Sequence, residues 1–165
     1  MSLNANLPAL SAERQKIIDQ RFAAFNPAEA SAERGAAVFK QNCAVCHQID
    51  GQGAVIGPQL DGVGARGAER IIEDILDPNR NVDVAFRTTL LVMRDGDVQT
   101  GLFRREEGAM IVLAQGNGQE MSVPKKDVQE RKETGTSLMP DNFSEAIKEG
   151  DFNDLVGFLV SKRVK

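Results

Sequence analysis

The two cysteines and the one histidine of the chain lie within five consecutive positions. Cys43, Cys46 and His47 form the segment Cys-Ala-Val-Cys-His. Two thiols three positions apart on a helical turn can each add to one vinyl group of a haem, and the next residue then places an imidazole beneath the iron. The spacing therefore predicts one covalently attached haem c, held through Cys43 and Cys46, with His47 as a ligand of its iron.

Three other uses of this segment are less well supported. A structural or redox disulfide of the Cys-x-x-Cys kind is typical of a segment that follows a thioredoxin-like strand, whereas the preceding residues have a helical pattern. A structural zinc ion takes four Cys or His ligands, and this chain contains three such residues. A catalytic Cys–His pair requires a geometry that residues adjacent in sequence rarely reach.

A methionine is the expected second ligand of the iron. Because His47 is the only histidine, ligation by two histidines of one chain is excluded, and a thioether is the usual alternative. Met93, Met110 and Met121 lie in alternating apolar runs, where methionine is more often a core residue. Met139 lies outside any periodic segment, in Thr-Ser-Leu-Met-Pro, and a loop beside a proline can hold a thioether at an iron. A six-coordinate iron has no vacant position for oxygen or peroxide, which favours electron transfer.

At these residues and in the loop that follows them, the chain resembles class I cytochromes c. Residues 57–66 are similar to the family's G-P-x-L-x-G-x-x-x-R loop. The resemblance implies that the carbonyl of Pro58 accepts a hydrogen bond from the imidazole of His47, and that Arg66 contacts a haem propionate. An ordinary arginine at the start of a helix is an equally good interpretation of Arg66. The resemblance also implies a mainly α fold, in which cytochrome c-like helices surround a covalent haem.

Two helices extend the resemblance. Gly35 and Phe39 lie four positions apart in the segment before Cys43, and residues 154–159 are similar to the family's terminal helix. The resemblance implies that these two helices cross closely, with the small Gly35 against Phe158.

The stretch between Arg66 and Met139 is longer than in a typical class I cytochrome c, and an insertion of this kind is expected to have structure of its own. In this respect the chain is similar to a variant haem-binding domain at the C-terminal end of large secreted bacterial proteins with dehydrogenase-like regions, as in planctomycetes. The resemblance implies an electron-transfer domain and not an enzyme. Its partner would be a fused dehydrogenase domain or a separate redox protein, in a periplasmic or otherwise extracytoplasmic location.

The insertion, at about residues 82–133, has the alternation of β-strands. Asp95-Gly96 and residues 116–118 are typical hairpin turns. The expected strands are residues 82–92, 98–102, 110–113 and 120–123, which make two hairpins of a small antiparallel sheet. We expect this sheet to cap a haem edge against water, and the alternative is a docking face for a redox partner. The charged residues 124–133 predict a solvated face.

The other segments have helical patterns. Residues 1–30 are interpreted as a helical extension or linker, in which Ile17, Ile18, Phe22 and Phe25 share a face, and residues 31–165 as the haem domain. Within that domain we expect a helix over about 32–43 capped by Ser31, a second over 68–76, and a final helix that buries residues 152, 155, 156 and 159.

The composition of the chain excludes some classes of function. A formal charge of −4 argues against a nucleic-acid binder. The sequence contains no run of 18 apolar residues, so we expect no transmembrane segment. Residues 1–30 lack the regions of a signal peptide. Since the resemblance to cytochromes c implies that haem is attached outside the cytoplasm, we expect the chain to be a mature form or an excised fragment. The competing functions are a haem-based sensor or small peroxidase, in which Met139 dissociates from the iron, and a non-redox domain in which haem serves folding and docking.

Overall fold

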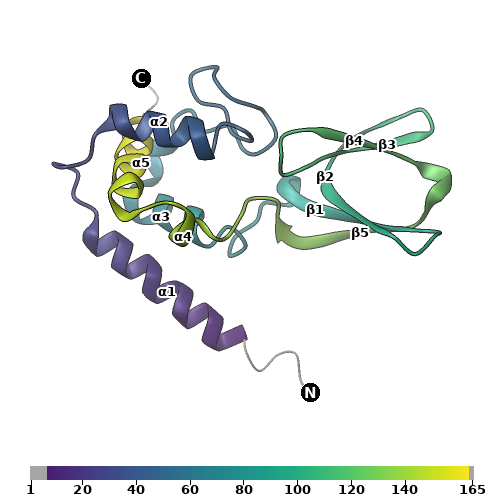
Figure 1. Cartoon of the computed structure of the whole chain (residues 1–165), viewed down its shortest axis with the longest axis horizontal. Coiled ribbons are helices and arrows are strands. Elements are labelled where there is room, and N and C mark those ends of the chain that lie inside the picture. The colour runs from purple at the N-terminus through teal and green to yellow at the C-terminus, as the bar shows by residue number, and fades with distance from the viewer. Residues whose placement is uncertain (1–6, 164–165) are drawn as a thin grey trace. The chain divides into compact units, whose positions relative to one another are not determined.

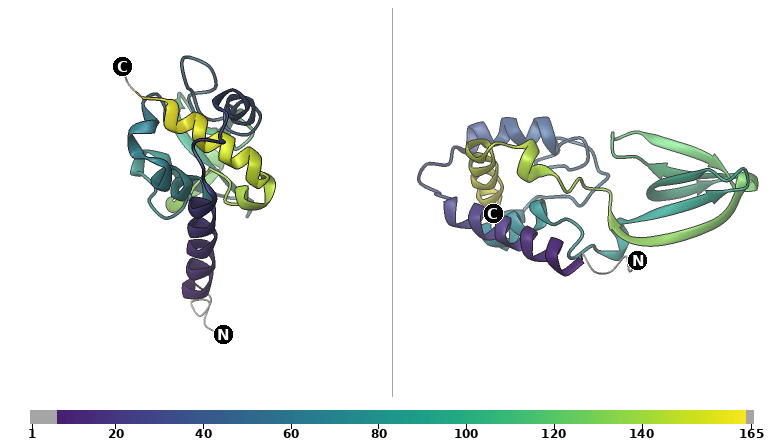
Figure 2. Two further views of the ribbon diagram at one scale, coloured as in Figure 1. Left: turned by 90° about the vertical axis from the view of Figure 1, so that its left-hand side faces the viewer. Right: turned by 60° about the horizontal axis from the view of Figure 1, so that its bottom comes forward.

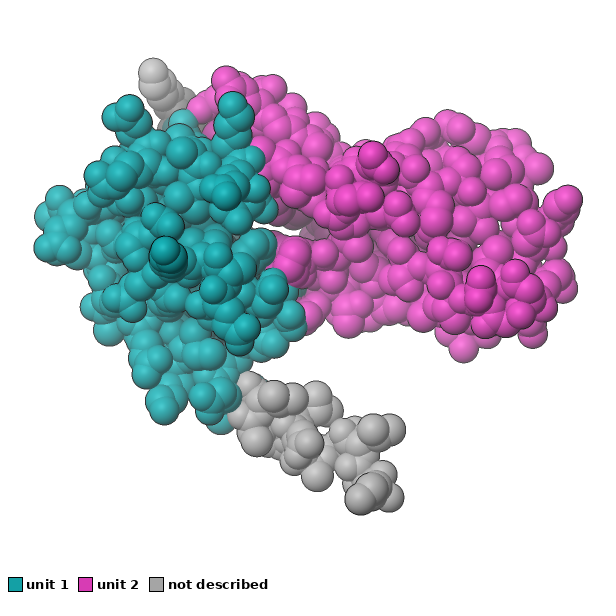
Figure 3. Space-filling view, in the orientation of Figure 1, with its two compact units in different colours: residues 1–42, 60–78, 141–165 teal, residues 43–59, 79–140 magenta. Residues whose placement is uncertain are grey.

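The computed structural model describes residues 7–163, which form two compact units (Figures 1 and 3). Unit 1 contains the helices and takes in the described parts of residues 1–42, 60–78 and 141–165. Unit 2 contains the sheet and takes in residues 43–59 and 79–140. Helix accounts for 40% and strand for 25% of the structure, so the fold is α and β rather than plainly mainly α. The division into an extension at 1–30 and a haem domain at 31–165 stays a prediction.

Unit 1 is a set of five α-helices within the described residues: α1 (Leu7–Ala24), α2 (Ala32–Asn42), α3 (Ala68–Leu76), α4 (Phe143–Ala146) and α5 (Glu149–Ser161). The N–H of Arg34 donates to Ser31 Oγ (3.2 Å), which confirms the predicted cap of α2. The core of the unit is made by residues from each long helix; its large members include Ile18, Phe39, Ile71, Ile72, Phe152, Leu155, Val156 and Phe158. Phe22 was expected on the buried face of α1, but its side chain is exposed.

Helices α2 and α5 cross closely, as Figures 1 and 2 show. The rings of Phe39 and Phe158 lie 5.6 Å apart, centroid to centroid. A Cβ added at Gly35 would lie 2.0 Å from the carbonyl oxygen of Asp154 and 2.7 Å from Phe158 Cβ. The predicted contact of Gly35 with Phe158 is therefore confirmed, and only glycine fits at this crossing.

Replacing Gly35 with alanine is expected to lower the free energy of unfolding by about 2–3 kcal/mol, because the two backbones must separate to admit a methyl group. Gly150→Ala is the matched control in α5, since an added Cβ there meets nothing within 4 Å. That variant is expected to gain about 0.5–1 kcal/mol from helix propensity. Denaturant unfolding of both variants measures the difference, and equal effects would contradict the close crossing.

Asp154 also joins α2 to α5 through hydrogen bonds. Its carboxylate accepts from the Ser31 N–H (2.7 Å) and from Arg34 Nε (2.6 Å) and Nη2 (2.9 Å). The side chain of Asp154 is nearly buried, whereas that of Arg34 is largely exposed. The hydrogen bond from Arg34 lowers the pKa of Asp154, assisted by the one from Ser31 and opposed by burial.

This depressed pKa makes part of the stability dependent on pH. The carboxylate stabilises the folded state fully above the unfolded-state pKa of about 3.9, and this contribution disappears as the pH falls through the lower folded-state pKa. We expect Asp154→Asn to be less stable than the wild type at pH 7 by an amount that stays constant down to about pH 4 and shrinks below it. Unfolding by denaturant between about pH 3 and 7 tests this, and a difference independent of pH throughout would contradict it.

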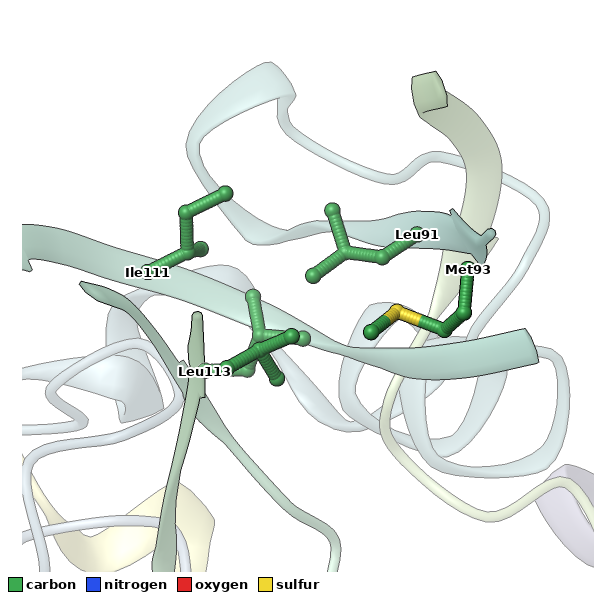
Figure 4. Packing of buried hydrophobic residues seen from close by; sticks show 5 residues of the cluster. Leu91, Met93, Ile111 and Leu113 are labelled. Carbon is green, nitrogen blue, oxygen red and sulfur yellow. The ribbon is translucent and has the colours of Figure 1, made fainter. Parts of the chain in front are cut away.

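Unit 2 is built on an antiparallel sheet of five strands in the order β4-β3-β2-β1-β5. Their bounds are β1 (Arg87–Met93), β2 (Val98–Glu107), β3 (Met110–Ala114), β4 (Glu120–Pro124) and β5 (Val128–Ser137). Leu91 and Met93 of β1 pack with Ile111 and Leu113 of β3 (Figure 4). Val123 belongs to the same cluster. Met121 packs against the same cluster, so the insertion has a hydrophobic core of its own.

Two strand predictions need correction. The strand expected from residue 82 begins at Arg87, because Asp83 Oδ1 accepts the Ala85 N–H (2.9 Å) and closes a 3-10 turn over Val84–Phe86. The charged stretch is exposed as predicted, but its second half belongs to β5, which pairs with β1 at the edge of the sheet. An edge strand with polar residues on both faces lacks the alternation by which a strand is recognised. None of the helices within residues 7–163 has both the length and the hydropathy of a membrane-spanning segment.

Candidate functional site

The Cys43–His47 segment forms a helical turn at the start of unit 2. The N–H of His47 donates to the carbonyl of Cys43 (2.9 Å), and so does the N–H of Cys46 (3.1 Å). Positions i, i+3 and i+4 lie on one side of such a turn. The backbone therefore directs Cys43, Cys46 and His47 to one side, as two-point attachment of a haem beside an iron ligand requires.

Both thiols are free and half-buried. Burial raises the pKa of Cys43 to about 12, with a smaller effect from neighbouring Cys46, and burial also raises the pKa of Cys46. Redox and zinc-binding cysteines have lowered pKa values, because their environments favour the thiolate. Nor do any three His, Cys, Asp or Glu side chains among residues 7–163 gather as a metal site. The surroundings of the two thiols therefore do not stabilise the thiolate that a redox or zinc-binding cysteine presents.

The imidazole of His47 is fixed by the loop that follows it. Its Nδ1 lies 2.7 Å from the carbonyl oxygen of Pro58. Since a carbonyl can only accept, Nδ1 carries the proton, and in a neutral ring Nε2 then carries the lone pair. Burial lowers the pKa of His47, and the bond to Pro58 only partly offsets this effect. The ring is thus neutral and held in one orientation, and the lone pair of Nε2 is available to bind an iron.

Gly57 packs directly against this ring. A Cβ at Gly57 would lie 2.7 Å from His47 Cε1 and 3.1 Å from Nδ1. The N–H of Gly57 also donates to the carbonyl of Cys46 (2.8 Å), which ties the loop to the attachment turn. In the sequence, Gly57 stands out only as the first residue of the loop motif at residues 57–66. Gly57 directly precedes Pro58, the predicted partner of His47, and this position could have indicated that Gly57 lies against the His47 ring.

The loop before Met139 is held by side-chain hydrogen bonds. The N–H of Ser137 donates to Asn79 Oδ1 (2.8 Å), and the N–H of Met139 donates to Ser137 Oγ (3.1 Å). Leu138 packs against the cluster Ile56, Leu102 and Ala114, which Cys46 also contacts. The residue before Met139 and the second attachment cysteine therefore share one apolar cluster within unit 2.

Arg66 lies in unit 1, where it has a carboxylate partner. Its Nε and Nη2 lie 3.0 and 2.6 Å from Asp74 Oδ2, and both side chains are exposed by more than a third. Arg66 ends the 3-10 helix Val63–Arg66, one residue before the N-cap of α3. This position and pairing accord with an arginine near the start of a helix, and a contact with a propionate stays a prediction.

The sheet of unit 2 contacts the loop that holds His47. Arg104 Nη2 donates to the carbonyl of Val55 (3.0 Å). Gly118, in the turn between β3 and β4, has a φ of +82°, and a Cβ there would lie 3.0 Å from the carbonyl oxygen of Val45. The inserted strands thus cover part of the segment 43–57.

Comparison with known proteins bears on this site. Residues 32–100, which include Cys43–His47 and the loop through Arg66, match the family model described as Cytochrome c. A protein described as Cytochrome c-553-like from Synechocystis sp. is 53% identical over 38 residues, which are 23% of this chain and 35% of that protein. The match thus spans about a third of that relative's length. Similarity to this family implies covalently bound haem c with iron as the cofactor.

Proposed function

We propose that the chain is a monohaem electron-transfer domain in which His47 and Met139 ligate the iron. The observation that carries this proposal is the hydrogen bond from His47 Nδ1 to the carbonyl of Pro58 (2.7 Å). This bond leaves the lone pair on Nε2, the nitrogen that would bind iron, and increases the basicity of that nitrogen. Iron-bound histidines are commonly oriented by such a hydrogen bond. The bound haem supplies one-electron chemistry, and the residues around it orient it and set its potential.

The proposed second ligand is Met139. Its backbone is held through Ser137 and Asn79, and its neighbour Leu138 shares an apolar cluster with Cys46. A thioether is a weak donor that favours ferrous iron, so this ligand raises the reduction potential. The inserted sheet, which contacts the carbonyl of Val55 and the backbone of Val45, serves in this proposal as a cap that keeps water from the haem.

We also propose a redox partner and a location for the chain. The chain contains no Trp and no Tyr, so an electron cannot hop through side chains of these types. Val45 and Val55 of the attachment loop are exposed and offer an apolar surface beside the haem attachment point. We infer that electrons leave here, to a redox protein or a dehydrogenase module, in a periplasmic or other extracytoplasmic compartment, as in the planctomycete-type proteins. Arg66 is proposed as a propionate contact.

Carbon monoxide binding to the reduced protein tests this function against the sensor or peroxidase alternative. With Met139 on the iron, we expect slow and incomplete binding, because the thioether must leave first. Met139→Ala is the positive control and should bind within the mixing time. Equally fast binding by the wild type would favour the sensor or peroxidase function.

A further inference from the structure

Helix α1 presents one stripe of side chains to the rest of unit 1. Arg14, Ile18 and Arg21 are spaced i, i+4 and i+7, which places them on the same face. Ile18 is 2% exposed and anchors the stripe in the core. Helix α1 precedes residues 32–100, the part of the chain that matches the cytochrome c family.

Arg14 binds the segment that follows Met139. Its Nη2 lies 2.9 Å from Asp141 Oδ2, and its Nη1 donates to the carbonyls of Asp141 (3.3 Å) and Leu76 (3.1 Å). Leu76 is the last residue of α3, so Arg14 satisfies a carbonyl that the helix end leaves without an intrahelical partner. One guanidinium therefore joins three points: α1, the end of α3 and residue 141.

Arg21 binds the same segment one step further along. Its Nη2 donates to the carbonyls of Ser144 (2.9 Å) and Ile147 (3.5 Å), on α4 and at its C-cap. The guanidinium carbon lies 5.1 Å from the centre of the Phe152 ring. The two arginines thus donate to four oxygen atoms of residues 141–147, three of the backbone and one of a side chain.

We propose that Arg14 and Arg21 are positioning residues for Met139. Through them, helix α1 holds residues 141–147, the chain that directly follows the loop of Met139. This inference rests on the proposed role of Met139. Asn79 and Ser137 fix the backbone before Met139, and the segment that Arg14 and Arg21 hold begins two positions after it. Because Arg14 and Arg21 hold the chain that follows Met139, loss of their bonds would free that chain to move and would weaken the hold on the thioether.

The test uses haem-loaded Arg14→Met, Arg21→Met and the double variant. Methionine is nearly as long as arginine and can pack beside the apolar neighbours of Arg21, which include Phe25, Ile72 and Phe152, so the change removes mainly the donors. Arg34→Met is the matched control, since Arg34 is an exposed arginine of the same unit that binds Asp154. Arg21→Lys, which keeps a positively charged group that donates hydrogen bonds, is expected to restore part of the wild-type behaviour.

Two readouts separate positioning from general stability. The affinity of the ferric protein for imidazole, which competes with the thioether, should rise about tenfold in the double variant, the equivalent of one or two ordinary hydrogen bonds. Exchange of the amides of Glu145, Ala146 and Ile147, each bonded within this segment, should accelerate in the same variant. Arg34→Met should change neither, even when it lowers the denaturation midpoint as much.

The two proposals fail in different ways. Unchanged imidazole affinity in the double variant, with Met139→Ala binding imidazole much more tightly than the wild type, would overturn the positioning role alone. If Met139→Ala instead binds imidazole like the wild type, Met139 is not the ligand, and both proposals fall.

Discussion

Gly57→Ala is expected to disrupt the proposed ligation by His47, because the added methyl group would meet the imidazole ring. The new Cβ would lie 2.7 Å from His47 Cε1, well inside van der Waals contact. The ring cannot retreat without breaking its hydrogen bond to Pro58, and the loop cannot retreat without breaking the bond from Gly57 N–H to the Cys46 carbonyl. We expect a fall of about 3 kcal/mol in unfolding free energy and a weakened bond from His47 to the iron.

Gly116→Ala provides the control for this experiment. Gly116 lies in a turn of the same unit, its φ is not in the left-handed region, and an added Cβ meets nothing within 4 Å. The control should keep the wild-type haem content, reduced spectrum and stability. A Gly57→Ala protein that matches the control in all three respects would show that the ring of His47 is not confined as described.

Met139→Ala is expected to remove the second ligand of the iron. The far-red band of the ferric protein that arises from a methionine–iron bond should vanish, because no other thioether replaces the lost one. The reduction potential should fall by more than about 59 mV, which is a tenfold change in a one-electron equilibrium, because the thioether favours ferrous iron.

Met110→Ala is the matched control, since Met110 is a half-buried methionine of strand β3. It should retain the far-red band and the potential. If the band persists in Met139→Ala and disappears in Met110→Ala, the assignment of the second ligand is wrong.

The local parts of the site could be predicted from the sequence. The turn that aligns Cys43 and His47 depends only on residues within it. The hydrogen bond between His47 and Pro58 followed from a resemblance carried by a short loop, and the contact of Gly35 with Phe158 followed from two helices of recognisable pattern.

What could not be predicted depends on partners distant in sequence. The bonds from Arg21 to the carbonyls of Ser144 and Ile147 have no signature, because any carbonyl can accept from any arginine. Strand β5 was missed since its residues are polar on both faces and its pairing with β1 crosses a long stretch of chain. The exposure of Phe22 likewise depends on which elements pack against α1, and the periodicity of the α1 sequence does not specify them.

The most direct test of the whole account is an absorption spectrum of protein exported together with a haem-attachment system, recorded before and after acid–acetone extraction. Covalent attachment through Cys43 and Cys46 predicts that the colour stays with the polypeptide and that reduction sharpens a c-type band. Colour that passes into the acetone, or a protein that is colourless from the start, would contradict covalent haem and the roles of His47 and Met139 with it.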